Sequence, residues 1–340
     1  MTSGGPAPAL RAGTGFCDAA AVLSAVGLGL FTALAGGRGA TAGEVSARVG
    51  LHPRAAGDFL NLLVTLGLLV RDDARYRNAE VTERHFVRGS PGYAGAFLEG
   101  AAHTLYPAWG GLTQLLRTGA APGAAPAAGF AEMLRDPAAR QGYLSMMDAL
   151  SAPLAPAIDA LVDWRGVRTV TDVGGNRGNL LGLLLARHPD ALGQVFDLPE
   201  HEADFRAHTR ALDVADRASF RGGDFFTDPL PHADLVILGH VLANWNAEQI
   251  AGLLAAAHDA VAPGGWLVVY DPLRDPARPD REALVASLHL ALMTPGGGGY
   301  TTDQYGQWIS RTGFTLETVR PAGPRDTVIA ARRPLQLTVR

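Results

Sequence analysis

Cysteine and charged residues are both scarce in this 340-residue chain. The single cysteine, Cys17, excludes a disulfide within the chain, which is typical of a reducing compartment. Its plainest interpretation is a small buried apolar residue. Charged residues make up only 18% and the formal net charge is −4, so no basic excess attracts nucleic acid or a membrane surface. We therefore expect a cytoplasmic protein that binds neither.

The amino end also lacks a basic segment followed by an apolar core, which a signal peptide needs. The most apolar early stretch, residues 19–37, is interrupted by Ser24 and by glycines. This pattern favours a buried amphipathic helix over a membrane span. Hydrophobic residues make up 47% of the sequence, enough for a sizeable core. The length suggests two domains, or one large domain with an appendage.

The first hundred residues are predicted to form a helical domain of winged-helix type. Residues 41–70 contain two helical patterns joined by a turn at Gly50–Pro53, and Thr41 and Glu44 have capping-box spacing. The following sixteen residues, RDDARYRNAEVTERHF, are predicted to form a short two-stranded wing.

A winged helix invites a DNA-binding hypothesis, but the second helix of this domain argues against it. His52 and Arg54 are its only basic or potentially basic residues, Asp58 is acidic, and the others are mostly apolar. A helix that reads a major groove needs polar side chains for base edges and phosphates. We expect this helix to be buried, against a second subunit.

The sequence pattern changes near residue 166. Before it, residues 92–118 and 138–163 are predicted to be helical, with an Ala/Pro/Gly-rich connector at 118–129 between them. After it, apolar strands alternate with helices, which indicates a parallel sheet of βαβ units. The strands are predicted at 168–175, 192–199, 218–226, 233–240 and 264–272. A helix and two strands in hairpin order follow in 301–333, so we expect an antiparallel end to the sheet.

The strongest local signal is the sequence TDVGGNRG. Its strand turns through Gly174 and Gly175, and Gly178 opens a helix, so a ligand can approach the backbone beside a helix N-terminus. Asp197, at the end of the next strand, can accept both hydroxyls of a ribose. Asn176 replaces the second glycine of the dinucleotide fingerprint; asparagine tolerates positive φ, but a pyrophosphate would be crowded. The pattern predicts a nucleoside cofactor without a pyrophosphate.

The sequence contains, in order, DVGGNRGNLLGLLLARHP, GQVFDLPE, RGGDFFTDPLPHADLVILGHVLANWN, PGGWLVVYDP and MTPGGGGYTT. This series resembles the class I S-adenosylmethionine-dependent O-methyltransferases of the plant caffeate and acetylserotonin type, with their actinobacterial relatives. The resemblance covers nearly the whole chain. It implies an α/β fold and three regions: a winged-helix-like dimerisation domain at 1–100, a helical connector contributing to the substrate pocket at 101–165, and a Rossmann-like catalytic domain at 166–340. It also implies a homodimer, S-adenosyl-L-methionine as cofactor and a small-molecule substrate.

The resemblance further implies cofactor contacts from the sulfonium to the adenine. The matched positions are Gly239 and His240 near the sulfonium, Gly174 at the methionine part, Asp197 at the ribose, and Leu198, Asp224 and Phe225 at the adenine. An acidic–aromatic pair such as Asp224 and Phe225 can read an amino edge and cover a ring face.

The chain departs from this family at the catalytic residues. The usual LHDW, with histidine as general base, is LANW here, so Ala243 and Asn244 replace histidine and aspartate. The two usual glutamates fall on Asp271 and Gly299. A positioned base contributes roughly 10²–10⁴ in rate, which matters little for an acidic enol or phenol. We expect methyl transfer mainly by proximity, with His240 or Asp271 assisting.

Further residues are predicted around the substrate. His103, His289 and Asn244 are candidates, although packed or surface histidines are the plainer interpretation. A metal on His103, His240 and His289 lacks a short-range ligand pattern, so we expect none. The wall of the substrate pocket is expected to be apolar, although most of its candidate residues could equally belong to the protein core. The wall candidates are Tyr106, Trp109, Phe130, Met146, Met147, Trp245, Met293 and Tyr300.

Two enzyme functions stay open. The first is methylation of a small aromatic or enolic natural-product intermediate, on oxygen or alternatively on carbon. The second is a hydroxylation, decarboxylation or cyclisation by an enzyme of this fold that binds S-adenosylmethionine without transferring its methyl group. A DNA-binding regulator is a third class, which would require salt-dependent binding to duplex DNA.

Overall fold

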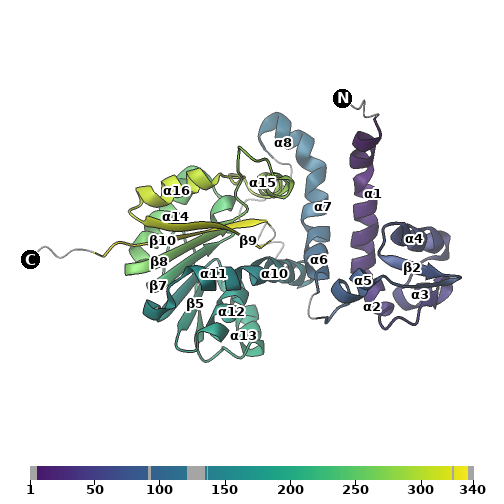
Figure 1. Ribbon diagram of the computed structural model, residues 1–340, viewed down its shortest axis with the longest axis horizontal. Helices are drawn as coiled ribbons and strands as arrows, with labels where there is room; N and C mark the ends of the chain where they lie inside the picture. The colour runs from purple at the N-terminus through teal and green to yellow at the C-terminus, as the bar shows by residue number, and fades with distance from the viewer. Residues whose placement is uncertain (1–5, 91–92, 121–134, 136, 324, 336–340) are drawn as a thin grey trace, which may run out of the picture. The chain divides into compact units, whose positions relative to one another are not determined.

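The computed structural model describes residues 6–90, 93–120, 135, 137–323 and 325–335 (Figure 1). The chain divides into two compact units, Met1–His103 with Gln141–Met146, and Thr104–Arg140 with Met147–Arg340. Phe130 and most of the predicted connector lie outside the described residues.

The N-terminal unit combines helices with a small sheet. Its helices are α1 (Ala7–Gly27), α2 (Leu30–Ala33), α3 (Ala42–Val49), α4 (Pro53–Thr65), α5 (Glu80–His85) and α6 (Gly95–His103). Strands β1 (Ala40–Thr41), β2 (Leu69–Asp72) and β3 (Arg75–Asn78) pair in the order β1-β3-β2. The predicted capping box is confirmed, since the Thr41 hydroxyl accepts from the Glu44 N–H and the Glu44 carboxylate accepts from the Thr41 N–H. The predicted wing is right for β2 and β3, but its last residues form α5.

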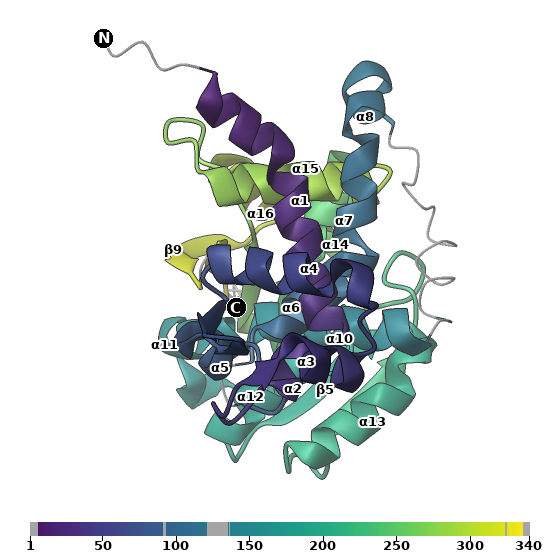
Figure 2. The same ribbon diagram turned by 90° about the vertical axis from the view of Figure 1, so that its right-hand side faces the viewer.

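Helix α1 changes the bounds expected for the early apolar stretch. It begins at Ala7, twelve residues before that stretch, and Gly29, with φ of 66°, separates it from α2. Its buried residues, Ala21, Ala25 and Val26, lie within the predicted stretch and pack into the N-terminal core, as expected. The preceding turns of α1 are mostly exposed, and so is Cys17, which was expected to be buried. By length and composition alone it could cross a membrane, a test that core helices of soluble proteins also pass. Figure 2 shows α1 crossing α4, against which it packs.

The second unit is built on a seven-stranded sheet in the order β6-β5-β4-β7-β8-β10-β9. The strands are β4 (Thr169–Val173), β5 (Leu192–Asp197), β6 (Ala218–Gly222), β7 (Ala233–Gly239), β8 (Val261–Asp271), β9 (Thr315–Ala322) and β10 (Asp326–Arg332). The first five are parallel, and β10 is antiparallel to both β8 and β9. Both predictions for this sheet, five parallel strands and an antiparallel end, are confirmed.

Helices cover both faces of this sheet (Figure 1). Helices α11 (Ala155–Leu161), α12 (Asn179–Arg187) and α13 (Glu202–Ala211) share one apolar core with it, while α14 (Ala247–Ala260) and α16 (Thr302–Arg311) share the other. Alternate residues of β7 enter the two cores, Ile237 the first and Val236 the second. A strand buried on both faces explains its continuous apolar sequence.

The predicted helices at 92–118 and 138–163 are broken into shorter pieces. After α6 these are α7 (Leu105–Ala108), η1 (Trp109–Gly111), α8 (Leu112–Thr118), α10 (Pro137–Ser151), η2 (Ala152–Leu154) and α11. Prolines 107, 153 and 156 lie at or near these junctions, where they fit the start of a new turn better than a helix interior. Helix α15 (Arg281–Met293) follows β8.

Candidate active site

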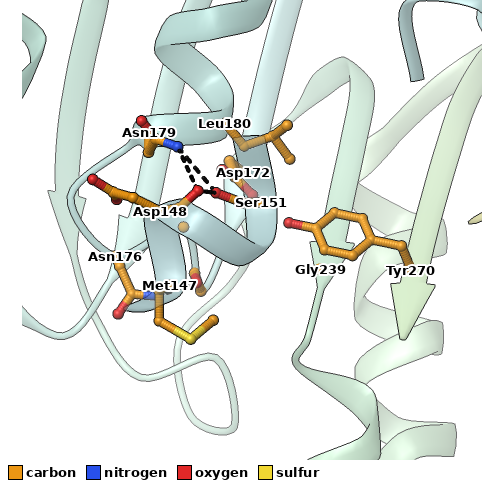
Figure 3. A pocket seen from close by; sticks show the side chains of 11 residues that line it. Met147, Asp148, Ser151, Asp172, Asn176, Asn179, Leu180, Gly239 and Tyr270 are labelled. Atoms are coloured by element: carbon orange, nitrogen blue, oxygen red, sulfur yellow. Dashed lines mark hydrogen bonds between the residues drawn. The ribbon is translucent and has the colours of Figure 1, made fainter. Parts of the chain in front are cut away.

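A pocket lies where β4 and β7 end, between the glycine loop and the last turns of α10 (Figure 3). Its lining consists of Met147, Asp148, Ser151, Asp172, Gly174, Gly175, Asn176, Asn179, Leu180, Gly239 and Tyr270. Three residues predicted from the sequence, Gly174, Gly239 and Met147, therefore share one pocket. It stands at the carboxyl edge of the sheet, where open α/β folds bind ligands.

The glycine loop has the conformation that its sequence predicts. Gly174, Asn176 and Gly178 have φ of 73°, 51° and 75°, and Gly178 caps α12. A β-carbon on Gly174 would lie 2.6 Å from a methyl group of Val241, so this position excludes side chains by space as well as by φ. The loop leaves its backbone open to a ligand.

Asp197 orients this loop from the end of β5. Its two carboxylate oxygens accept the backbone N–H groups of Asn176 and Leu198, each at 2.7 Å. Burial raises the pKa of Asp197, while the nearby His201 and these two N–H groups act in the opposite direction. A fixed carboxylate beside an open glycine backbone fits a ribose. Leu198, next to Asp197 in the chain, is half-buried.

The predicted adenine residues follow β6. Asp224 is exposed, and its carboxylate accepts the Phe226 N–H at 2.9 Å, which closes a tight turn. Phe225 is half-buried and meets Trp245 edge to face at 5.9 Å between ring centres. The structure thus offers a carboxylate and an aromatic ring after β6, which fits an adenine.

Sequence inspection missed Asp172 and Tyr270 in the pocket. Burial, with the negative charge of Asp197, raises the pKa of Asp172 to about 7. The Tyr270 ring extends from β8 over Gly239, with its hydroxyl end towards Ser151 and Asp172 (Figure 3). A β-carbon on Gly239 would lie 1.9 Å from Cζ of Tyr270. A large aromatic in β8 opposite the glycine that ends β7 was the available signal.

The last turns of α10 are tied to the glycine loop, and sequence inspection missed this too. Arg177 donates to the Asp148 carboxylate through Nε at 2.9 Å and also through NH2. The Asn179 amide donates to Ser151 Oγ at 3.1 Å. These pairs join residues about thirty positions apart, and no local pattern marks them.

Asp271 is buried beneath the turn that contains Ala243. Its Oδ2 accepts the Tyr305 hydroxyl at 2.8 Å and the Ala243 N–H at 3.3 Å. Burial raises the pKa of Asp271 to about 7, although the charge of His240 and the Tyr305 hydrogen bond lower it. Ala243 is itself buried, in the 3-10 turn η5 (Leu242–Asn244). The Asp271 carboxyl therefore stabilises this turn.

Gly299, where the resemblance leads one to expect a glutamate, has no room for a side chain. Its N–H donates to Ser287 Oγ at 2.9 Å, and a β-carbon there would lie 2.3 Å from the same oxygen. Ser287 of α15 thus occupies the space that a side chain at 299 would need.

His240 directly follows β7 and has φ of 53°, in the left-handed region that few non-glycine residues adopt. Its Nε2 lies 3.0 Å from Oδ1 of the buried Asp326, and its Nδ1 is buried without a partner among the described residues. The ring meets Tyr270 edge to face at 4.9 Å. Asn244 donates to the His240 carbonyl at 2.8 Å. His240 is thus paired and enclosed next to Gly239, and it does not itself line the pocket.

The remaining predicted substrate residues fall into two groups. The Trp109 indole N–H donates to Nδ1 of His289, with ring centres 5.1 Å apart, and Met293 is half-buried on the same helix as His289. By contrast, His103 at the end of α6 and Tyr106 in α7 are exposed. Within the described ranges, no three His, Cys, Asp or Glu side chains gather to hold a metal ion.

Among the other wall candidates, Met146 is buried in the N-terminal unit, while Trp245 and Tyr300 are joined. The Tyr300 hydroxyl donates to the Trp245 carbonyl at 2.7 Å, which connects the segment after α15 to the turn at Ala243.

Comparisons with known proteins agree with this geometry. Residues 111–315 match the family model of the O-methyltransferase domain, and residues 10–88 match the O-methyltransferase dimerisation domain. The chain is 40% identical to the tetracenomycin polyketide synthesis 8-O-methyl transferase of Streptomyces glaucescens, over 97% of both chains. It is 37% identical to an N,N-dimethyltransferase of Streptomyces rimosus, over 90% of both. The structure resembles human N-acetylserotonin methyltransferase in complex with S-adenosylmethionine, with a TM-score of 0.87, 26% identity and coverage of 98% and 99%.

The fold, the pocket at the carboxyl edge and these similarities lead to one conclusion. The chain belongs to the O-methyltransferase family and is an S-adenosylmethionine-dependent methyltransferase that carries the family's dimerisation domain.

Proposed function

We propose that this enzyme transfers a methyl group to a phenolic or enolic hydroxyl of an aromatic polyketide intermediate. The observation that carries this proposal is the 40% identity, across nearly the whole chain, with an 8-O-methyl transferase of tetracenomycin polyketide synthesis. The half-buried pair of Trp109 and His289 fits the same conclusion, since a flat aromatic acceptor needs an apolar wall with few polar groups.

The bound cofactor supplies an electrophilic methyl group on its sulfonium. The protein's residues would hold the cofactor along the carboxyl edge: Gly239 and Gly174 at the methionine end, Asp197 at the ribose, and Leu198, Asp224 and Phe225 around the adenine. Met147, Asn244, Trp109, His289 and Met293 would border the acceptor, with Tyr106 near its opening.

No general base is needed at position 243 for this reaction. A positioned base contributes about 3–5 kcal/mol, whereas holding two reactants in contact can contribute about 7–11 kcal/mol. Asp271 is engaged by Tyr305 and by the Ala243 N–H, so we assign it to positioning the turn. His240 is engaged by Asp326, and we assign it the same kind of role.

The enzyme would act as a homodimer in the cytoplasm. Helix α1 exposes most of its apolar length in the single chain, and it belongs to the region that matches the dimerisation domain. A partner subunit would cover it. Light scattering of the purified protein, with a mass of twice 35.5 kDa expected, tests this point.

The decisive experiment follows the methyl group. The enzyme is incubated with methyl-labelled S-adenosylmethionine and hydroxylated polycyclic polyketides, and products are analysed by mass spectrometry. Label on oxygen supports the proposal. Label that stays in the cofactor during turnover supports the alternative, a hydroxylation, decarboxylation or cyclisation. Label on nitrogen would follow the Streptomyces rimosus relative, and label on carbon would also exclude O-methylation.

A substitution at the unusual position sharpens this result. If the acceptor ionises without help, Ala243→His should change the rate less than about tenfold. A rise of 10²-fold or more would show that a missing base limits the wild-type enzyme. A collapse with unchanged cofactor affinity would show that the acceptor uses the space above Ala243.

A further inference from the structure

We propose that Arg325 and His289 bind the acceptor oxygen as its anion and so replace the general base that position 243 lacks. This inference rests on the proposed function, and it concerns two residues outside the motifs that identify the family. Both belong to the second unit, as does Trp109.

Arg325 lies at the carboxyl edge of the sheet. Strand β10 runs antiparallel to β8, and Thr327 is paired with Asp271, the last residue of β8. Arg325, two residues before Thr327, therefore stands just beyond that edge. Its neighbour Asp326 is paired with His240 at the end of β7. Arg325 is thus next to the strand ends that carry the cofactor pocket and the Ala243 turn.

The Arg325 guanidinium has no anionic partner among the described residues. Its Nε is buried without a hydrogen bond, and the side chain is half-buried. The adjacent carboxylate, Asp326, is engaged by His240, and burial raises the pKa of Asp271 to about 7, which reduces its negative charge near neutral pH. A half-buried guanidinium without a counter-ion is costly in the free protein and favours an anion that can accept its N–H groups.

His289 is fixed as a hydrogen-bond donor by its contact with Trp109. The Trp109 indole N–H can only donate, so Nδ1 of His289 must accept, and the proton of the neutral ring is on Nε2. Burial, together with the positive charge of Arg325, lowers the pKa of His289 to about 4. The imidazole is therefore neutral near pH 7 and offers an N–H rather than a proton-accepting site.

These two groups suit a phenolate. The acceptor hydroxyl releases its proton to water, and the resulting oxygen anion accepts hydrogen bonds from Arg325 and His289. The anion then attacks the methyl carbon: the O–C bond forms, the S–C bond breaks, and the bonding electrons remain on sulfur, which becomes a neutral thioether. An opposite charge within about 4–6 Å lowers the pKa of an ionisable group by about 1–3 units. Arg325 thus increases the fraction of reactive acceptor without removing the proton itself.

The test measures the ionisation of a bound phenol directly. Alizarin, a dihydroxyanthraquinone that changes colour on ionisation, is titrated with pH in the presence of wild-type enzyme and S-adenosylhomocysteine. We expect bound alizarin to ionise at least about one pH unit below free alizarin. Arg325→Met should abolish this shift, Arg325→Lys should retain part of it, and His289→Phe should reduce it. Arg320→Met, which removes an exposed arginine from β9 of the same hairpin, is the matched control and should leave the shift intact.

Calorimetric affinity for S-adenosylhomocysteine, expected to be unchanged in Arg325→Met and Arg325→Lys, shows that the variants are folded. The inference is overturned if alizarin does not bind the wild type, binds as the neutral phenol, or ionises equally in Arg325→Met. These outcomes do not depend on methyl transfer. Methyl transfer to oxygen, without a change in the pH at which bound alizarin ionises, would contradict only the anion site. A change in that pH without methyl transfer would contradict only the proposed function.

Discussion

Asp197 and Asp271 end strands β5 and β8, and both are buried, yet they serve the two sides of the site differently. Asp197 uses both oxygens to accept backbone N–H groups of the glycine loop and of Leu198. Asp271 uses one oxygen for the Tyr305 hydroxyl and the Ala243 N–H. The first carboxylate shapes a surface for a ligand of constant structure. The second supports the buried turn at Ala243, which in the proposed function borders a variable acceptor.

Under the proposed function, this difference would let the acceptor side do without the base that the family resemblance predicts at position 243, while the cofactor side keeps its residues. The sulfonium reacts with any sufficiently electron-rich atom placed in line with it, so the cofactor side cannot change without loss of the reaction. The acceptor side needs only to hold and ionise its substrate. The predictions below test whether the two sides are separable.

The largest effect is expected at Asp197. Asp197→Ala removes the acceptor of two charge-assisted hydrogen bonds, each worth about 1.5–3 kcal/mol, and releases the glycine loop. We expect affinity for S-adenosylhomocysteine, measured by calorimetry, to fall by roughly 100-fold or more. Asp190→Ala, at an exposed position, is the control. An affinity within about threefold of wild type would contradict the role of Asp197.

Gly239→Ala should destabilise the protein through Tyr270. The added β-carbon would lie 1.9 Å from Cζ and 2.1 Å from the hydroxyl oxygen of Tyr270, so the ring or the strand end must move. Overpacking of this kind costs about 1–3 kcal/mol in thermal or denaturant unfolding. The double variant Gly239→Ala/Tyr270→Ala removes the clash. Its loss of stability should therefore be smaller than the sum of the losses in the two single variants. Strict additivity would show that the ring does not cause the clash.

Much of the cofactor side is predictable from sequence because its signals are local. Gly174, Asn176 and Gly178 require positive φ within one turn, and Asp197 follows at a fixed distance set by one helix and one strand. The only signal for Tyr270 is its place opposite Gly239, and this depends on the register of two strands rather than on the local sequence.

The acceptor side is less predictable because its partners are far apart in sequence. Trp109 and His289 are separated by 180 positions, and His240 and Asp326 by 86. The sequence indicates histidines as candidates there, but only the folded chain shows that His289 is a donor and that His240 is already paired. Proline positions, likewise, hint at breaks in the helices before residue 166 that apolar periodicity alone conceals.

Asp271→Asn should change how stability depends on pH. The pKa of Asp271 is raised from 3.8 to about 7 in the folded protein, so the folded state binds more protons than the unfolded state between these values. The wild type is therefore most stable below the unfolded pKa and loses this contribution as pH rises through about 7. Asparagine stays neutral, so the stability of the variant relative to wild type should rise between pH 5 and pH 8.

The pKa difference of Asp271 between the folded and unfolded states corresponds to at most about 4 kcal/mol of unfolding free energy. Relaxation of the buried region reduces the expected pH-dependent change to the order of 1–2 kcal/mol. Denaturant unfolding of both proteins at the two pH values measures it. Asp172, whose pKa is raised in the same direction, is present in both proteins and cancels in the difference. If the difference in unfolding free energy between the variant and the wild type is constant, or moves in favour of the wild type as pH rises, Asp271 is charged in the folded state.

The smallest effect, and the sharpest separation of the two sides, is expected from a pair of matched tyrosine variants. Tyr270→Phe removes a hydroxyl from the cofactor pocket and should weaken S-adenosylhomocysteine binding about three- to tenfold, the usual contribution of one hydrogen bond. Tyr305→Phe removes an equally buried hydroxyl, but one that donates to Asp271 beneath the Ala243 turn. It should leave cofactor affinity unchanged and raise the KM of the acceptor instead. If both variants weaken the cofactor equally, the two carboxylates at the ends of β5 and β8 belong to one coupled network, and the acceptor side is not free to vary independently of the cofactor side.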